Sequence, residues 1–125
     1  MYSEKIKNHY TNPRNSGRIA NPSAEAIVRS TVDSDTVLIT MSIENGVVTD
    51  VRFKCMGCAV AIACSSIATE MVLGKGVEEA EKISKQDVAD ALDGIPEYKM
   101  VCSNLAPDAI RKALQDWRQK QGEVS

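Results

Sequence analysis

The chain has 125 residues, of which 43% are hydrophobic and 26% are charged, and this composition is typical of one globular domain with a single core. The formal net charge is only −2 and no run of like charges stands out, so we expect neither nucleic-acid binding nor capture by anionic membranes. No apolar stretch has the length that a signal peptide or a spanning helix needs. We therefore expect a cytoplasmic protein.

Four cysteines accompany a single histidine. Thiols in the cytosol are kept reduced, so cysteines there are more often metal ligands, redox groups or buried side chains than parts of a disulfide framework. The cysteines are thus the first place to look for chemistry.

The amino-terminal segment predicts a short helix over residues 3–10, which ends before Pro13 because proline restricts its own φ and the residue before it. Turn-forming residues then predict a surface loop to about residue 23. We expect residues 1–23 to form a mobile arm.

Three strands are predicted next. Residues 26–30 form a short candidate, while residues 37–44 and 47–54 alternate between apolar and polar side chains with the period of a half-buried strand. Asn45 and Gly46 lie between the two longer runs and predict a tight hairpin, so these strands are antiparallel neighbours.

Helices follow the strands. A buried helix is predicted over residues 59–73 with a glycine stop, then a short helical piece over 77–83, and Ser84 begins a capping box for another segment. The last helix is predicted to start near Pro107 and to reach a polar end at 119–121. The expected fold is one α+β domain over residues 1–125, with a small three-stranded antiparallel sheet covered on one face by helices.

Cys55 and Cys58 form a C-x-x-C turn between the second long strand and the helix after it. Such a turn lets two thiolates point at one atom, the helix N-terminus favours their anionic form, and Gly57 allows a sharp turn. Cys102 is expected just ahead of the last helix. Cys64 falls inside the apolar helix, where a cysteine is usually a small core residue.

Several site types remain open on these residues alone. A zinc ribbon is disfavoured, because it usually needs a second C-x-x-C pair and this chain has only one. A thioredoxin-like dithiol stays possible, although the strands before Cys55 form a hairpin and lack the crossover helix of that motif. His9 lies in the first helix away from the cysteine segments, so we expect a surface residue. Without a histidine near the cysteines, serine and cysteine hydrolases are disfavoured.

Asp33 and Asp35 stand just before the first long strand. Such residues often only form turns, because their side chains bond nearby backbone amides. However, a hairpin places the start of one strand beside the end of the next. The topology therefore predicts that Asp33 and Asp35 lie close to Cys55 and Cys58.

Short sequence blocks at fixed spacing run along nearly the whole chain, at residues 2–5, 9–10, 12–15, 52–54, 57–58, 61–63, 65–66, 69–70, 99–100 and 102–103. Together they resemble the IscU/NifU amino-terminal-domain family of iron–sulfur cluster assembly scaffolds. The insertion that SufU-type zinc-dependent relatives carry between their second and third ligand cysteines is missing here. The resemblance implies a scaffold rather than an enzyme, which receives sulfur from a cysteine desulfurase and passes a 2Fe–2S or 4Fe–4S cluster to apo acceptor proteins.

The resemblance also implies a ligand set. Asp35, Cys58 and Cys102 match family ligands, and Cys102 would also accept persulfide sulfur. The family's first ligand cysteine is replaced by Asp33 and its ligand histidine by Val101. Either Cys55 or Asp33 then completes the set, and we favour Cys55 because iron in such clusters prefers thiolate to carboxylate.

These departures leave alternatives open. The site could bind a single zinc or iron ion, Cys55 and Cys58 could act as a dithiol oxidoreductase, or the chain could be a paralogue that no longer binds metal. A homodimer could also share one cluster. Residues 95–99 depart from the family's chaperone-binding segment, which leaves the use of an Hsp70-type chaperone open.

Overall fold

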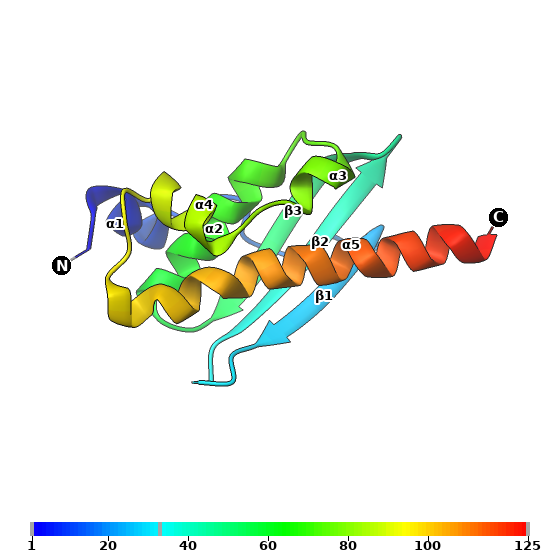
Figure 1. Ribbon diagram of the computed structural model, residues 1–125. Helices are drawn as coiled ribbons and strands as arrows, with labels where there is room; N and C mark the ends of the chain where they lie inside the picture. Colours follow the sequence, from blue (N-terminus) through cyan, green and yellow to red (C-terminus); the bar gives the residue numbers. More distant parts are fainter. Residues whose placement is uncertain (1, 33, 125) are drawn as a thin grey trace.

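The sheet is built from three antiparallel strands in the order β1-β2-β3, with the main helices packed on one face (Figure 1). The computed structural model describes residues 2–32 and 34–124. Its elements in chain order are α1 (Glu4–Thr11), β1 (Ala24–Arg29), β2 (Thr36–Glu44), β3 (Val47–Met56), α2 (Ala59–Val72), α3 (Val77–Ala80), α4 (Lys85–Ala91), the 3₁₀ helix η1 (Glu97–Asn104) and α5 (Leu105–Val124).

The alternation in β2 and β3 has the predicted effect of making one face of the sheet apolar. Val37, Ile39 and Met41 of β2 are fully buried, and so is Val51 of β3. The two residues of the connecting turn, Asn45 and Gly46, have φ of 54° and 75°, which is the left-handed geometry that a tight hairpin requires. The predicted α+β fold and hairpin are confirmed.

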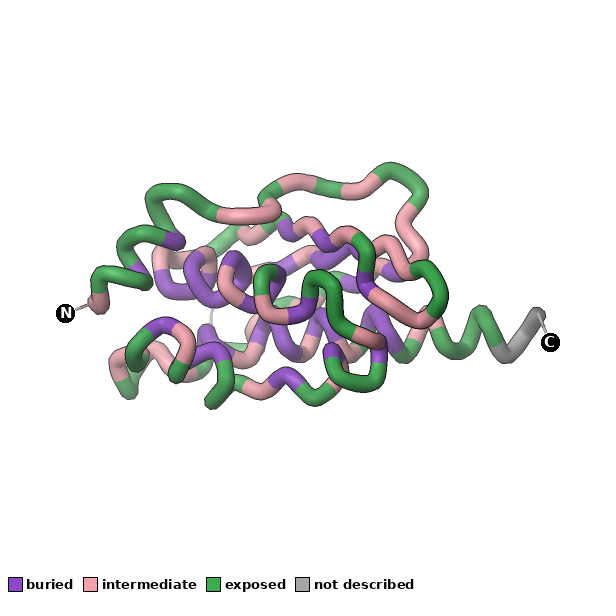
Figure 2. Tube along the Cα trace, turned by 90° about the horizontal axis from the view of Figure 1, so that it is seen from above, coloured by how far each residue is buried: buried purple, intermediate pink, exposed green. Residues whose placement is uncertain are grey.

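Two helices cover this apolar face. α2 packs on β3, while α5 packs on β1 and β2, and Figure 2 shows the buried positions gathered where these helices meet the sheet. Small side chains dominate both contacts, since the buried residues include Ala61, Ala63 and Ala68 of α2 and Ala106, Ala109 and Ala113 of α5. Small side chains let the helices approach the sheet closely and place their first turns near its edge. In the described parts of the chain, none of the helices is long and apolar enough to cross a bilayer.

The segment before the last helix differs from the prediction. We predicted a helix from near Pro107 to about residue 121 and no element directly before it, but η1 occupies Glu97–Asn104 and α5 runs over Leu105–Val124. Pro107 still lies in the first turn of α5, where its missing amide is tolerated. The glutamines and lysines near the end are good helix formers, so they extend α5 beyond the predicted end.

The amino-terminal segment is attached to the domain at several points. The Gly17 amide donates to the Phe53 carbonyl at 2.8 Å, and the Ile19 amide donates to Thr40 Oγ1 at 3.0 Å. Ser3 caps α1 and also donates its hydroxyl to the Leu92 carbonyl at 2.6 Å. The predicted helix and loop are confirmed, while the predicted mobility of residues 1–23 stays a prediction.

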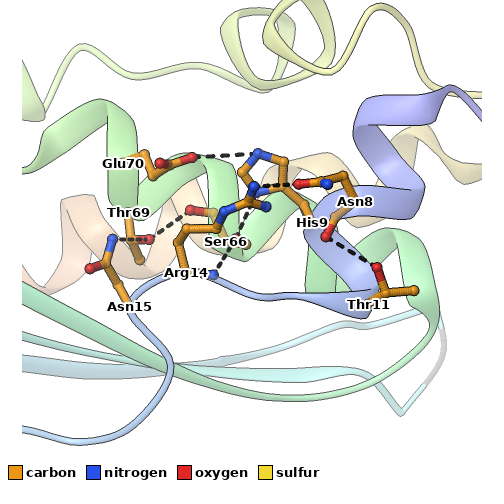
Figure 3. Close-up of polar contacts among 8 residues, drawn as sticks. All are labelled: Asn8, His9, Thr11, Arg14, Asn15, Ser66, Thr69 and Glu70. Carbon is orange, nitrogen blue, oxygen red and sulfur yellow. Dashed lines mark hydrogen bonds and ion pairs between the residues drawn. The ribbon is translucent and has the colours of Figure 1, made fainter.

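The expectation that His9 is a surface residue is wrong, because His9 is only 7% exposed. Its Nδ1 lies 2.7 Å from Ser66 Oγ and its Nε2 lies 3.4 Å from Glu70 Oε1 (Figure 3). The Arg14 amide also donates to Ser66 Oγ at 2.9 Å. His9 and Ile6 share the face of α1 that packs on α2, so His9 fastens the amino-terminal segment to that helix.

A neutral His9 ring fits these contacts, with the Ser66 hydroxyl donating to Nδ1 and the proton on Nε2 facing Glu70. Burial, and to a lesser extent the Arg14 and Lys5 charges, lower the pKa of His9 below its ordinary value of 6.5, while Glu70 acts in the opposite direction. Protonation of His9 therefore costs more in the folded chain than in the unfolded one.

This difference predicts a pH-dependent stability. Below pH 6.5 the unfolded chain binds a proton at His9 that the folded chain binds only at lower pH, so the free energy of unfolding falls as the pH drops from 7.5 to 5.5. His9→Gln keeps a polar partner for Ser66 without titrating, so its stability should fall less over this interval. Urea unfolding at both pH values measures the difference. Identical losses in the two proteins would contradict this account of His9.

Candidate metal centre

Three ligating groups converge at one end of the sheet. A carboxylate oxygen of Asp35 and the Sγ atoms of Cys58 and Cys102 all lie within 4.8 Å of one another. The two sulfurs are 3.6 Å apart, and Cys102 Sγ lies 3.9 Å from Asp35 Oδ2. Ligand atoms about 2.3 Å from a tetrahedral metal lie about 3.8 Å from one another. The spacing thus suits ligands of one metal ion.

The hairpin brings Asp35 to Cys58. Thr36, the first residue of β2, pairs with Met56, the last residue of β3. Asp35 precedes the one and Cys58 follows the other by two residues, so both lie at the same end of the two strands, as the sequence predicts. Asp33, the fourth residue of the predicted group, lies outside the described residues.

Gly57 fits closely against Asp35. A Cβ atom on Gly57 would lie 2.7 Å from Asp35 Cγ and 2.9 and 3.0 Å from its two oxygens. The sequence predicts that Gly57 permits a sharp turn, but its φ is not in the left-handed region. Glycine is needed here because the Asp35 carboxylate occupies the space of a side chain.

Cys58 and Cys102 are held by helical segments. Cys58 is the N-cap of α2, and its Sγ accepts a hydrogen bond from the Ala61 amide at 3.5 Å. Cys102 lies in η1 and is only 2% exposed, while Cys58 is half-buried. Cys58 is therefore the more exposed of the two residues.

Lys99 places a positive charge beside this site. It lies three residues before Cys102 in η1, and residues at this spacing lie on the same side of a 3₁₀ helix. The negative charge of Cys58, with a smaller contribution from Cys102, raises the pKa of Lys99. Sequence reasoning missed this role because it did not expect η1, although the spacing from Cys102 would have indicated it. Val101, which the resemblance matches to the family's ligand histidine, is 40% exposed.

Cys55 does not lie within the 4.8 Å group. The Ser65 hydroxyl nearby donates to the Ala61 carbonyl at 2.8 Å. Burial raises the pKa of Cys55 to about 11, with Asp35 and Cys58 adding to the effect and the Ser65 side chain opposing it. To bind a metal as a thiolate, Cys55 must lose its proton.

Cys64 is fully buried in α2, as predicted for a core residue. Burial strongly raises the pKa of its thiol, and the charges of Cys102, Cys58 and Cys55 add to the effect. A buried neutral thiol of this kind acts as a small apolar side chain.

The sequence is similar to known proteins over nearly its whole length. The chain matches the family described as NifU-like N terminal domain over residues 1–124. It is 45% identical to iron–sulfur cluster assembly scaffold protein IscU 1 of Archaeoglobus fulgidus, over 99% of this chain and 81% of that protein. It is 40% identical to the iron–sulfur cluster assembly scaffold protein IscU of Escherichia coli, over 96% of each chain.

The fold is also similar to a solved structure. The crystal structure of a nitrogen-fixing NifU-like protein, amino-terminal part, from Brucella abortus superposes with a TM-score of 0.76 over 94% of each chain, at 24% identity. That likeness concerns the fold alone, whereas the sequence matches extend over nearly the full length. The chain belongs to the NifU-like N-terminal domain family.

Proposed function

We propose that this protein is a scaffold on which iron–sulfur clusters are assembled and from which they are passed to other proteins. The observation that carries the proposal is the convergence of Asp35, Cys58 and Cys102 within 4.8 Å in a chain of this family. Relatives at 40–45% identity bear the name of such scaffolds. The cluster is the cargo of the scaffold, so binding must be firm enough for assembly and weak enough for release.

The donor set suits this requirement. Cys58 and Cys102 supply thiolates, the ligands that iron–sulfur clusters prefer, while Asp35 supplies a carboxylate, which binds such a site more weakly. Lys99 offsets part of the negative charge that these ligands bring together. The carboxylate makes the cluster easier to lose and so favours transfer.

Cys55 is our proposed fourth ligand. It lies at the end of β3, where the charges of both Asp35 and Cys58 act on its thiol. Coordination would offset the loss of its proton, because a thiolate binds iron more strongly than the carboxylate of Asp33 would. Asp33 is the alternative fourth ligand.

A scaffold of this kind needs one partner that supplies sulfur and others that receive the cluster. We infer that a cysteine desulfurase supplies persulfide sulfur, that Cys102 accepts it, and that apo iron–sulfur proteins receive the finished cluster. Met56 and Tyr98, near Cys58 and Cys102 in sequence, are 79% and 74% exposed, and we infer that they offer these partners a docking surface. The same surface would let two copies share one cluster. In this role the protein acts in the cytoplasm and is a scaffold rather than an enzyme.

A mononuclear site is the second candidate. The separations of 3.6 and 3.9 Å match the edges of a tetrahedron around one zinc or iron ion. Acid-labile sulfide distinguishes the two functions, because only a cluster contains it. The Cys55–Cys58 oxidoreductase receives less support, since Cys58 makes its sulfur contact with Cys102.

Reconstitution tests the ligand assignment. With iron, sulfide and a cysteine desulfurase under anaerobic conditions, the native chain should form a cluster that absorption and Mössbauer spectra detect. Cys58→Ala and Cys102→Ala should each reduce its retention by more than about tenfold, since even outer-shell changes cost about 10–100-fold at metal sites. Equal cluster content in the native chain and either variant would refute the assignment.

The fourth ligand is tested in the same experiment. Cys55→Ser should lower the cluster yield and change the Mössbauer parameters, whereas Asp33→Ala should leave both unchanged. The reverse pattern would assign the position to Asp33 instead of Cys55.

The close contact at Gly57 gives a second prediction. In Gly57→Ala the new Cβ displaces the Asp35 carboxylate, so affinity for Co²⁺, followed by its thiolate absorption, should fall by about tenfold. Gly76→Ala is the matched control, because its Cβ would meet only the Gly46 carbonyl oxygen at 3.7 Å. Thermal unfolding of both variants checks that the fold persists. Equal Co²⁺ affinity in the two variants would show that Asp35 is not a ligand.

Replacing the weaker ligand tests the role of Asp35 in release. Asp35→Cys offers a third thiolate at the same position, so it should slow cluster transfer to an apo acceptor several-fold. Asp50→Cys, which adds a thiol at a half-buried position of β3, is the control. Transfer is followed by the visible circular dichroism of the acceptor. Faster transfer from Asp35→Cys than from the native chain would contradict the proposed role.

A further inference from the structure

Cys58 and Cys102 have the geometry of a reactive thiol pair. Their Sγ atoms are in contact at 3.6 Å and neither residue forms a disulfide. A disulfide bond is about 2.05 Å long, so bond formation needs an approach of about 1.5 Å. Cys64 is fully buried, and Cys55 lies outside the group of ligand atoms within 4.8 Å of one another. The pair therefore stands apart from the other two cysteines.

The sulfur chemistry of the proposed function needs a source of electrons. The outer sulfur of a persulfide is at the oxidation level of elemental sulfur, whereas the sulfur of a cluster is sulfide. Each persulfide sulfur must therefore gain two electrons before it enters a cluster. Two thiols supply two electrons when they join as a disulfide.

We propose that Cys58 and Cys102 act as a dithiol that reduces sulfane sulfur held on Cys102 and releases it as sulfide. This inference rests on the proposed function only for the origin of that sulfur. The Cys58 thiolate attacks the Sγ atom of the Cys102 persulfide, a new Cys58–Cys102 disulfide forms, and the bond to the outer sulfur breaks. The outer sulfur leaves as HS⁻ with the electron pair of that bond. An external dithiol reductant then restores both thiols.

The structure favours this intramolecular route over attack by a thiol from solution. Cys58 Sγ already lies 3.6 Å from Cys102 Sγ, so the attacking thiol needs no encounter from solution. The Ala61 amide holds Cys58 Sγ in place, and such positioning replaces a bimolecular encounter by a unimolecular step. Lys99 brings a positive charge to the place where HS⁻ forms.

The same two sulfurs are the proposed metal ligands, so metal binding and sulfide release exclude each other on one chain. A metal ion bound to Cys58 occupies the lone pair that attacks the persulfide. In the disulfide form, in turn, Cys58 and Cys102 are no longer thiolates, so Asp35 has no thiolate beside it with which to bind a metal. Zn²⁺ added before the sulfur donor should therefore suppress sulfide release.

The test uses the full reduced chain without iron or desulfurase. The chain is treated anaerobically with inorganic polysulfide, excess reagent is removed, and released sulfide and intact mass are followed over time. The native chain should release sulfide and end two hydrogens lighter than the reduced protein, with Cys58 joined to Cys102 in the peptide map. Cys64→Ala, which changes only a core cysteine, is the control and should behave as the native chain.

Cys58→Ser is the decisive variant, because serine is a good N-cap and should preserve α2. It should retain a persulfide on Cys102, seen as a mass gain of about 32 Da, and release less than about a tenth of the native sulfide. The inference is overturned if Cys58→Ser releases as much sulfide as the native chain, or if the disulfide joins a different pair. Circular dichroism confirms that the variant is folded.

This outcome is independent of the scaffold proposal. A native chain that releases sulfide with a Cys58–Cys102 disulfide, but holds no cluster on reconstitution, would support the dithiol and contradict the scaffold. A chain that holds a cluster but forms no such disulfide would contradict the dithiol alone.

Discussion

The pairing register of β2 with β3 is the constraint on which the site depends. Ile39 opposite Phe53 and Thr36 opposite Met56 place Asp35 beside the turn that carries Gly57 and Cys58. A slip by one residue would turn the buried side chains of β2 to the outer face of the sheet. The burial of these side chains thus stabilises the register, and the register places a carboxylate next to a thiol. The core and the metal centre are determined by the same set of backbone bonds.

The hairpin places Asp35, and helical segments place the two cysteines of the proposed site. α2 starts at Cys58 and packs on β3 through small side chains, so the orientation of its first turn is fixed by the core. η1 contacts both α2 and α4, and it carries Cys102 and Lys99 to the opposite side of the site. Cys58 and Cys102 therefore belong to helical segments that pack on the core, and Asp35 directly precedes β2.

Local patterns in the sequence sufficed for much of this structure. The alternation in β2 and β3, the turn at Asn45 and Gly46, and the apolar α2 are all short-range signals, and they predicted the approach of Asp35 to Cys58. The contact of Cys58 with Cys102 spans 44 positions in the chain, and no local pattern encodes it. Matching the blocks to a family suggested it only indirectly, through a shared ligand set.

Burial of polar groups was the other feature that the sequence could not show. His9 has few apolar neighbours in sequence, yet Ser66 and Glu70 of α2 provide the partners that make its burial possible. Gly57 looked like a turn residue, since the Asp35 carboxylate that fills its side-chain space comes from a different element. In both cases the contacting residue is distant in sequence, so the structural role of His9 or Gly57 becomes clear only when that contact is known.

The chemistry that we propose lies on two sulfur atoms, because the fold brings Cys58 Sγ and Cys102 Sγ to 3.6 Å from one another. A thiol pair that close can bind a soft metal or form a disulfide, and in our proposal one state excludes the other. Whichever reaches the pair first, metal or sulfane sulfur, then decides between the two states. If the proposal holds, the redox state of the pair controls its metal binding.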